Sequence, residues 1–427
     1  MDDGARAGGR GGDTPGMLPR LLGWRVVILL PLVLLLGGGV PVPAQAGPAV
    51  LLLDPAALSA AQAAAAAGDP ALQPALQLLR ARADQALGDG PFTVTAKTQP
   101  PPSGDVHDYT SLSIYWWPDP QGGPYVQRDG VRNPEADDAT RYDAAAASKL
   151  TGDVESLALA YFLTGHTEYA HHAVDLLHGW FVDPATCMHP NLTYAQLIPG
   201  RQQVRGIGII EGRRFTRIVD SISLLDGCSC FSAADRQALR QWFGALADWL
   251  RSSRNGQLEA AAANNHGVWY DVQVADFALF GGDTETARQV VAAARERRIA
   301  DQIAPDGSLP RELARTRSLH YSNFDLQAFA ELATLGQQVD VDLWGYQAPT
   351  GASLRAALDF LVPYLSGAQT WPYDEITQVD AFAEAGQTLN RASQAYPDAG
   401  YQDLLAQLAA DQSPLDQLRL HLGLWPD

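Results

Sequence analysis

Apolar residues recur every three to four positions along most of this chain, the spacing of one buried helix face. Two such stretches, Leu157–Leu163 and Ala170–Phe181, flank Thr164-Gly165-His166-Thr167, so the pattern predicts a helix hairpin whose second helix is capped by Thr167. Alternating strand patterns are scarce, and Thr93–Ala96 is one short candidate. Further helices are predicted over Ala233–Arg251, Thr284–Ala300, Leu354–Leu365, Ala381–Ser393 and Tyr401–Ala410.

A chain with many helices and few strands has two main architectures, an open solenoid and a closed or partly closed (α/α) toroid. A solenoid repeats its sequence at a fixed period, and here the helix hairpins carry no repeating signature. Two long segments, 98–140 and 183–212, also interrupt the helices. Loops of this length inside a compact domain are usually functional. The sequence therefore predicts an all-α fold, an incomplete (α/α) toroid whose loops build a cleft.

The first 46 residues are predicted to be a signal peptide. Arg20 and Arg25 flank the start of the apolar run Val26–Leu36, and Ala44-Gln45-Ala46 offers a small-residue cleavage site. The run is shorter than the roughly 20 residues that span a bilayer, which favours a signal peptide over a membrane span. An uncleaved membrane anchor is the alternative. Because no linker divides the remainder, residues 47–427 are expected to form one large domain, or else two tightly packed ones, and to be periplasmic or secreted.

The charge of the chain narrows its possible partners. It has 30 Lys and Arg against 48 Asp and Glu, a formal net charge of -18. Such a chain lacks the basic face that nucleic acids require, so we expect no nucleic-acid partner. We also expect no stable membrane partner and a monomeric state. Lys97 and Lys149 are the only lysines, so an anion site has to be built from arginine.

The three cysteines allow at most one disulfide bond. They are Cys187, Cys228 and Cys230, and their spacing leaves the pairing open. Cys228-Ser229-Cys230 lacks the second ligand pair that a structural metal site needs. We therefore expect neither a metal nor another cofactor.

The dipeptide Asn265-His266 stands out within an alanine-rich stretch. Ala260–Ala263 favours a helix, whereas asparagine and histidine are poor residues for a helix interior. A polar cap or a hydrogen-bonded core histidine would explain the pair structurally. The other unusual polar segments of the chain favour a functional role instead.

The two long loops contain side chains of the kind that line sugar sites. Trp116 and Trp117 lie in Tyr115–Pro120, and aromatic rings suit the apolar faces of sugars, although either ring can instead anchor the loop. In the second loop Asn191, Tyr194 and Gln196 are neutral hydrogen-bonding residues. They can line sugar subsites or satisfy the backbone of the loop itself.

A third segment, Gly307–Ser322, is rich in arginine. Pro310 suits the first turn of a helix. If that helix continues, Arg317 and Tyr321 are four residues apart and share a face, whereas Arg315 points about 120° away. Three arginines in seven residues of an acidic chain indicate an anionic ligand or several salt bridges.

In this order, Tyr115–Pro120, Asn191–Gln196, Asn265-His266 and Arg315–Tyr321 resemble the all-α alginate lyase family of polysaccharide lyases. The resemblance covers roughly Asp108–Tyr373 and implies an (α/α) toroid that cleaves uronate polymers, alginate or polymannuronate above all, to 4,5-unsaturated ends. It assigns Asn265 and Arg315 to the substrate carboxylate, whereas helical geometry favours Arg317 as the neighbour of Tyr321. It assigns His266 and Tyr321 to proton transfer.

Proton transfer has two geometries in such a reaction. If H5 and O4 lie on one face of the ring, Tyr321 can act as both base and acid. If they lie on opposite faces, His266 is the base and Tyr321 the acid. Tyrosine has an ordinary pKa of about 10, so as a base it requires a lowered pKa, which a nearby arginine or imidazolium would supply.

Other functions also fit the sequence. Glucuronan or another polyuronate is an alternative substrate. A glycoside hydrolase on the same toroid would need two suitably spaced carboxylates, for which Asp271, Asp374 and Glu375 are candidates. A non-catalytic binding protein of the solenoid type is the third possibility.

Overall fold

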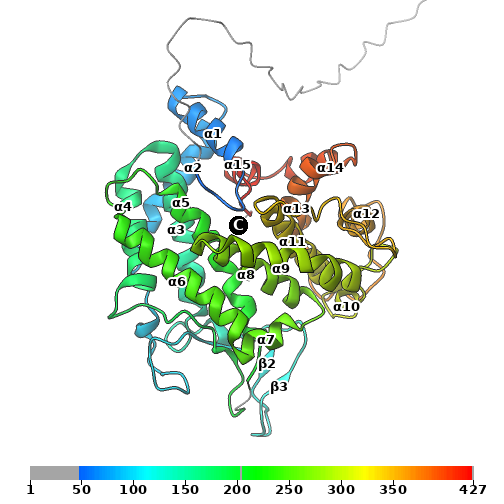
Figure 1. Ribbon diagram of the computed structural model, residues 1–427, viewed down its shortest axis with the longest axis horizontal. Coiled ribbons are helices and arrows are strands. Elements are labelled where there is room, and N and C mark those ends of the chain that lie inside the picture. The colour runs from blue at the N-terminus through cyan, green and yellow to red at the C-terminus, as the bar shows by residue number, and fades with distance from the viewer. Residues whose placement is uncertain (1–47, 202–203, 426–427) are drawn as a thin grey trace, which may run out of the picture. The chain divides into compact units, whose positions relative to one another are not determined.

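Helices make up most of the structure, and strands are few and short (Figure 1). The computed structural model describes residues 48–201 and 204–425. The α-helices are α1 Pro55–Ala67, α2 Gln73–Ala86, α3 Ala144–Thr164, α4 Thr167–Leu177, α5 Phe215–Leu224, α6 Ala233–Ser252, α7 Arg254–Ala260, α8 Asn265–Gly281, α9 Thr284–Ala294, α10 Pro310–Leu313, α11 Ser318–Gln337, α12 Leu354–Leu365, α13 Ala381–Ala395, α14 Tyr401–Ala409 and α15 Pro414–Leu422.

Shorter elements connect these helices. The 3-10 helices are η1 Val94–Ala96, η2 Pro134–Asp137 and η4 Ile207–Arg214, and π-helical turns extend α4 and α9 as η3 His178–Val182 and η5 Arg295–Ala300. The strands are β1 Thr110–Leu112, β2 Trp116–Trp117, β3 Val126–Gln127 and β4 Tyr194–Leu197.

The predicted helices are confirmed, with small shifts at their ends. The α3–α4 hairpin turns at Gly165, whose φ of 73° is left-handed and suits glycine. Thr167 is the first residue of α4 and His166 precedes it, so the predicted cap at Thr167 is wrong by one residue. The predicted helix 284–300 is α9 followed by the π-helical turn η5.

The strand prediction was wrong, and strands form where none was predicted. Val94–Ala96 is a 3-10 turn. Strand β1 pairs in parallel with β4, which joins the two long loop segments, and β2 pairs antiparallel with β3. These strands have two to four residues, so they are too short to show the alternating pattern from which strands are predicted.

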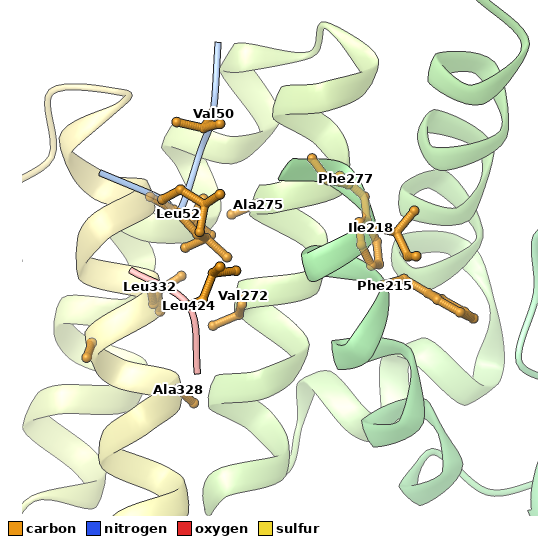
Figure 2. Close-up of a cluster of buried hydrophobic side chains, with 14 of the residues drawn as sticks. Val50, Leu52, Phe215, Ile218, Val272, Ala275, Phe277, Ala328, Leu332 and Leu424 are labelled. Carbon is orange, nitrogen blue, oxygen red and sulfur yellow. The ribbon is translucent and has the colours of Figure 1, made fainter. Parts of the chain in front are cut away.

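Helix α8 lies at the centre of the helical packing, against α5, α6, α9 and α11. Its side chains are buried on nearly every side, the polar Asp271, Gln273 and Asp276 included. Figure 2 shows Val50 and Leu52 from the start of the described chain and Leu424 from its end, packed with Val272 of α8 and Leu332 of α11. Both ends are thereby fixed in the core.

Buried polar contacts hold these ends in place. The Asp220 carboxylate accepts hydrogen bonds from the backbone N–H groups of Leu51, Leu52 and Leu53, at 2.6, 2.9 and 2.9 Å. The Glu155 carboxylate of α3 accepts two hydrogen bonds from Arg217, from Nε and Nη2, and one from Arg419 Nη2, each at 2.6 Å. Helices α3, α5 and α15 are therefore joined through one buried carboxylate.

A disulfide joins Cys228 to Cys230, and Cys187 is free, consistent with at most one bridge. No helix in the described part of the chain has the length and apolar character needed to cross a bilayer. The predicted signal peptide, residues 1–46, lies outside the described residues, which belong to one compact unit.

Candidate active site

A cavity of about 630 Å³ opens where α8 and α11 begin. Asn265 and His266 are the first two residues of α8, and Tyr321 lies in the first turn of α11, preceded by Arg315. All four line the cavity, and the two helices pack against each other. The fold therefore places the four predicted catalytic residues, from two segments about 50 residues apart, around one space.

A tight turn between α7 and α8 positions Asn265 and His266. Its carbonyls at Ala260 and Ala262 accept hydrogen bonds from Arg298, which also pairs with Asp271. A Cβ on Gly267 would lie 2.1 Å from Ala262 O and 2.3 Å from Arg298 Nη1, so the turn requires glycine there. The break in the alanine-rich helix noted in the sequence is this turn.

Asn265 is fully buried and held by a single carboxylate. Its backbone N–H and its Nδ2 both donate to Glu312 Oε1, each at 2.8 Å. Burial raises the pKa of Glu312, although these two bonds act in the opposite direction. Nδ2 carries two hydrogens, so one remains for a ligand while Glu312 fixes the amide.

His266 is held by a second carboxylate. Its Nδ1 lies 2.6 Å from Glu259 Oε1. A carboxylate only accepts hydrogen bonds, so Nδ1 carries the proton and Nε2 of the neutral ring is an acceptor. Burial disfavours the charged ring, but the carboxylates of Glu259 and Glu312 outweigh it and raise the pKa of His266. This is the arrangement of a general base oriented by a carboxylate.

The Tyr321 hydroxyl lies 2.6 Å from the Tyr115 hydroxyl, and the Arg315 guanidinium lies 3.8 Å from the centre of the Tyr321 ring. The sequence predicted that such an arginine would lower the pKa of Tyr321. Burial and Tyr115 instead raise the pKa, and Arg315 offsets them only in part. Tyr321 is therefore protonated in the free protein, which suits a proton donor.

The segment that carries the arginines is not one helix, so the geometry expected for a continuous helix is wrong. Helix α10 starts at Pro310 as predicted but ends at Leu313, and α11 starts at Ser318. Arg315 lies in the intervening turn, paired with Asp129 at 2.6 Å. Arg317 also lines the cavity and donates from Nε to Thr377 Oγ1 at 3.1 Å. Arg315, not Arg317, stacks on Tyr321.

The predicted sugar-binding residues divide into two groups. Trp116 and Gln196 line the cavity, whereas Trp117, Asn191 and Tyr194 lie outside its lining. Trp117 donates from its indole to Val131 O at 2.9 Å, which anchors the loop. Asn191 bonds Asp108 and the backbone of Thr193, so it serves the loop itself. The side chain of Tyr194, on β4, has no hydrogen-bond partner among the described residues.

The residues that support the site were not predicted from the sequence. Tyr115 adjoins the aromatic motif, and Glu312 lies within the arginine-rich segment, so both were close to residues already singled out. Glu259 and Asp129 meet His266 and Arg315 only through the fold, and no sequence signal points to them. Arg213 also lines the cavity and was not predicted.

The carboxylates proposed for a hydrolase do not face this cavity. Asp271 pairs with Arg298 in the core, and Asp374 and Glu375 lie outside the lining. Across residues 48–201 and 204–425, no group of three or more His, Cys, Asp or Glu side chains is arranged to hold a metal ion.

Known proteins share both the sequence and the architecture. The family model described as Alginate lyase matches residues 93–371. An alginate lyase from Bacteroides ovatus is 36% identical, with a TM-score of 0.83 over 88% of this chain and 99% of that one. Alginate lyase A1-III from Sphingomonas species A1 is 17% identical, with a TM-score of 0.57 over 88% of this chain and 98% of that one, a likeness of fold alone. No curated protein matches the sequence.

The fold and these matches define a polysaccharide lyase on an (α/α) toroid, which confirms the predicted architecture and class of enzyme. The family model spans more than half of the sequence, and the chain belongs to the alginate lyase family. Its substrate is accordingly an anionic polysaccharide, a polyuronate.

Proposed function

We propose that this enzyme cleaves alginate, including its polymannuronate stretches, by β-elimination in the cavity at the start of α8 and α11. The observation that carries the proposal is the pairing, in one cavity, of a protonated tyrosine with a histidine whose Nε2 is an acceptor. Acting together, they can remove one proton and supply another.

Charge on the substrate carboxylate has to be neutralised first. Removing H5 from a uronate builds negative charge on a carboxylate that is already anionic. The free hydrogen of Asn265 Nδ2 and the guanidinium of Arg315 are the groups proposed to bind it, because charge-assisted hydrogen bonds strengthen as that charge grows. The pairing of Arg315 with Asp129 holds the guanidinium near the Tyr321 ring.

The elimination then moves one electron pair along the sugar. A base takes H5, the C5–H electrons form the C4=C5 double bond, and the C4–O4 bond breaks. Tyr321, which holds its proton, protonates O4 as it leaves. The products are one chain with a new hydroxyl and one with a 4,5-unsaturated uronate, and no water is consumed.

The role of His266 depends on the sugar. Where H5 and O4 lie on opposite faces, His266 Nε2 takes H5 directly. Where they share a face, Tyr321 takes H5 only after losing its own proton, and His266 is the proposed acceptor of that proton. Both routes need His266 and Tyr321, and the raised pKa of Tyr321 makes the second route the more demanding one.

We further propose that the enzyme is exported to the periplasm or the medium and acts as a monomer. The support for export is the sequence of residues 20–46. The cavity and the four side chains assigned to the reaction belong to one chain, so the reaction as proposed requires no second subunit.

A panel of polyuronates tests the proposed substrate. We expect product formation, followed by ultraviolet absorbance, to be fastest on alginate or polymannuronate and slower on glucuronan. Faster cleavage of glucuronan would keep the lyase chemistry and reassign the substrate.

A further inference from the structure

Arg213 is a charged side chain in the cavity wall that lacks a counter-ion within the described residues. Five arginines line the cavity. Four of them have polar partners: Arg132 with Asp137, Arg315 with Asp129, Arg214 with Ala144 O, and Arg317 with Thr377. Within residues 48–201 and 204–425, the Arg213 guanidinium forms neither an ion pair nor a hydrogen bond, only contacts with aromatic rings.

The two rings that contact Arg213 locate it at the floor of the cavity. Its guanidinium carbon lies 5.0 Å from the centre of the Phe324 ring and 5.6 Å from that of Trp269. Trp269 follows Asn265 by four residues on α8, and Phe324 follows Tyr321 by three on α11. One helical turn is 3.6 residues and about 5.4 Å. Arg213 therefore lies about one turn below Asn265 and Tyr321, between the two helices.

An unpaired guanidinium at such a place is costly. Burial lowers the pKa of Arg213 to about 10, so the side chain is still charged at neutral pH. Contacts with ring faces offset only part of the cost of removing this charge from water without a partner. Glu331 attracts Arg213 only from beyond ion-pair distance, and its Oε1 accepts from Trp425. A guanidinium in this position is suited to binding an anion.

We propose that Arg213 binds a second carboxylate of the polyuronate, carried by a sugar next to the one that reacts. The inference rests on the proposed function and deepens it. Every sugar of a polyuronate carries a carboxylate, and Asn265 and Arg315 are assigned to that of the reacting sugar. Arg213, one turn deeper, is left for a neighbour. It would select chains in which consecutive sugars are charged.

Binding to an inactive variant tests this site apart from catalysis. The probe is tetramannuronate, titrated by calorimetry into His266→Ala and into the double variant His266→Ala with Arg213→Gln. A charge-assisted hydrogen bond is worth roughly tenfold to hundredfold in affinity, and we expect the double variant to bind more weakly by that factor. Arg213→Lys in the same background should restore part of the loss.

Two controls separate charge recognition from damage to the cavity. A tetrasaccharide whose carboxyl groups are reduced to alcohols should bind both proteins equally. Arg132→Gln removes a cavity arginine already paired with Asp137, and it should change the Kd for tetramannuronate by less than about twofold. The melting temperature of Arg213→Gln should stay the same or rise, because a buried unpaired charge is removed.

The outcomes distinguish this site from the function on which it rests. If the His266→Ala protein binds no tetramannuronate, the proposed function fails. If it binds, and Arg213→Gln weakens binding by less than twofold or weakens the neutral tetrasaccharide equally, the Arg213 site alone is overturned. A fall in the melting temperature with unchanged affinity would make Arg213 a structural residue.

Discussion

Two arginines four residues apart, Arg213 at the end of η4 and Arg217 in α5, have opposite surroundings. Arg217 donates two hydrogen bonds to Glu155, which also accepts from Arg419, and all three side chains are mostly buried. Arg213 faces the cavity between two aromatic rings and is left without a counter-ion by the described residues. The same residue type thus serves the fold at one position and remains open to a ligand at the next turn.

The contrast extends to the rest of the cavity. Asn265 Oδ1 and Glu312 Oε2 are buried atoms without hydrogen-bond partners in the described chain. Asn265 lines the cavity and is held by Glu312, so these two acceptors lie where a substrate hydroxyl could donate to them. Substitutions in the cavity should therefore remove activity and spare stability, whereas substitutions in the Glu155 cluster should do the reverse.

The largest effect is expected on the cavity side of this contrast. Tyr321→Phe removes the proton donor and His266→Ala removes the acceptor. Each should lower kcat by about 10²–10⁴-fold, the usual contribution of a positioned acid or base. Steady-state rates on alginate check this, with circular dichroism melting as the control for the fold. Wild-type turnover in either variant would remove that residue from the mechanism.

Glu155→Gln tests the structural side of this comparison. Removing this carboxylate takes its ion-pair partner from Arg217 and one partner from the buried Arg419, so the free energy of unfolding should fall by about 3–5 kcal/mol. Folded protein at low temperature should keep its kcat. The measurement is denaturant unfolding of both proteins, and equal midpoints would show that the cluster is not structural.

The same cluster predicts how stability depends on pH. Glu155 is fully buried, yet Arg217 and Arg419 outweigh burial and lower its pKa to about 2. A carboxylate with a lowered pKa stabilises the fold above its unfolded value of about 4.5, and this contribution, on the order of 3 kcal/mol, is lost as the pH falls toward 2. Glu155→Gln should flatten that acid dependence.

A smaller effect is expected for Glu259→Gln, which leaves the His266 ring but removes its carboxylate. The pKa of His266 is raised mainly by Glu259. In the wild type, the acid limb of kcat/KM should therefore lie above pH 6.5, the ordinary value for histidine. In the variant the limb should move to lower pH while kcat falls by about tenfold, because the base is weaker. If the acid limb stays at the same pH in the variant, a group other than His266 is responsible for it.

The smallest effect is expected for Asn191→Ala. Asn191 lies outside the cavity lining and bonds Asp108 and Thr193 within its own loop. Its kcat/KM should stay within about twofold of the wild type, while stability falls by about 0.5–1.5 kcal/mol through the lost hydrogen bonds. Trp116→Ala is the matched comparison from the cavity lining, and a larger loss for Asn191→Ala would contradict the division between cavity-lining residues and residues that support the loops.

Residues whose roles depend on local pattern could be predicted from the sequence. The helices follow the three-to-four spacing of apolar residues, and Asn265-His266 stood out because the pair interrupts alanines. The turn between Leu313 and Ser318 could not be predicted, because nothing in Ala314–Arg317 forbids a helix. That break places Arg315, and not Arg317, over Tyr321.

Contacts that depend on how helices and loops meet could not be predicted from the sequence. Glu259 meets His266 because α7 ends beside α8, and Tyr115 meets Tyr321 across 206 residues. The pKa of Tyr321 depends on those contacts, which is why the lowered value expected from a nearby arginine did not follow.

The measurement that tests the central claim most directly is product analysis of alginate digested by the enzyme. β-Elimination predicts products that absorb in the ultraviolet through a C4=C5 double bond and whose masses add up to that of the substrate. Saturated products whose summed mass exceeds the substrate by one water would show hydrolysis and contradict the account.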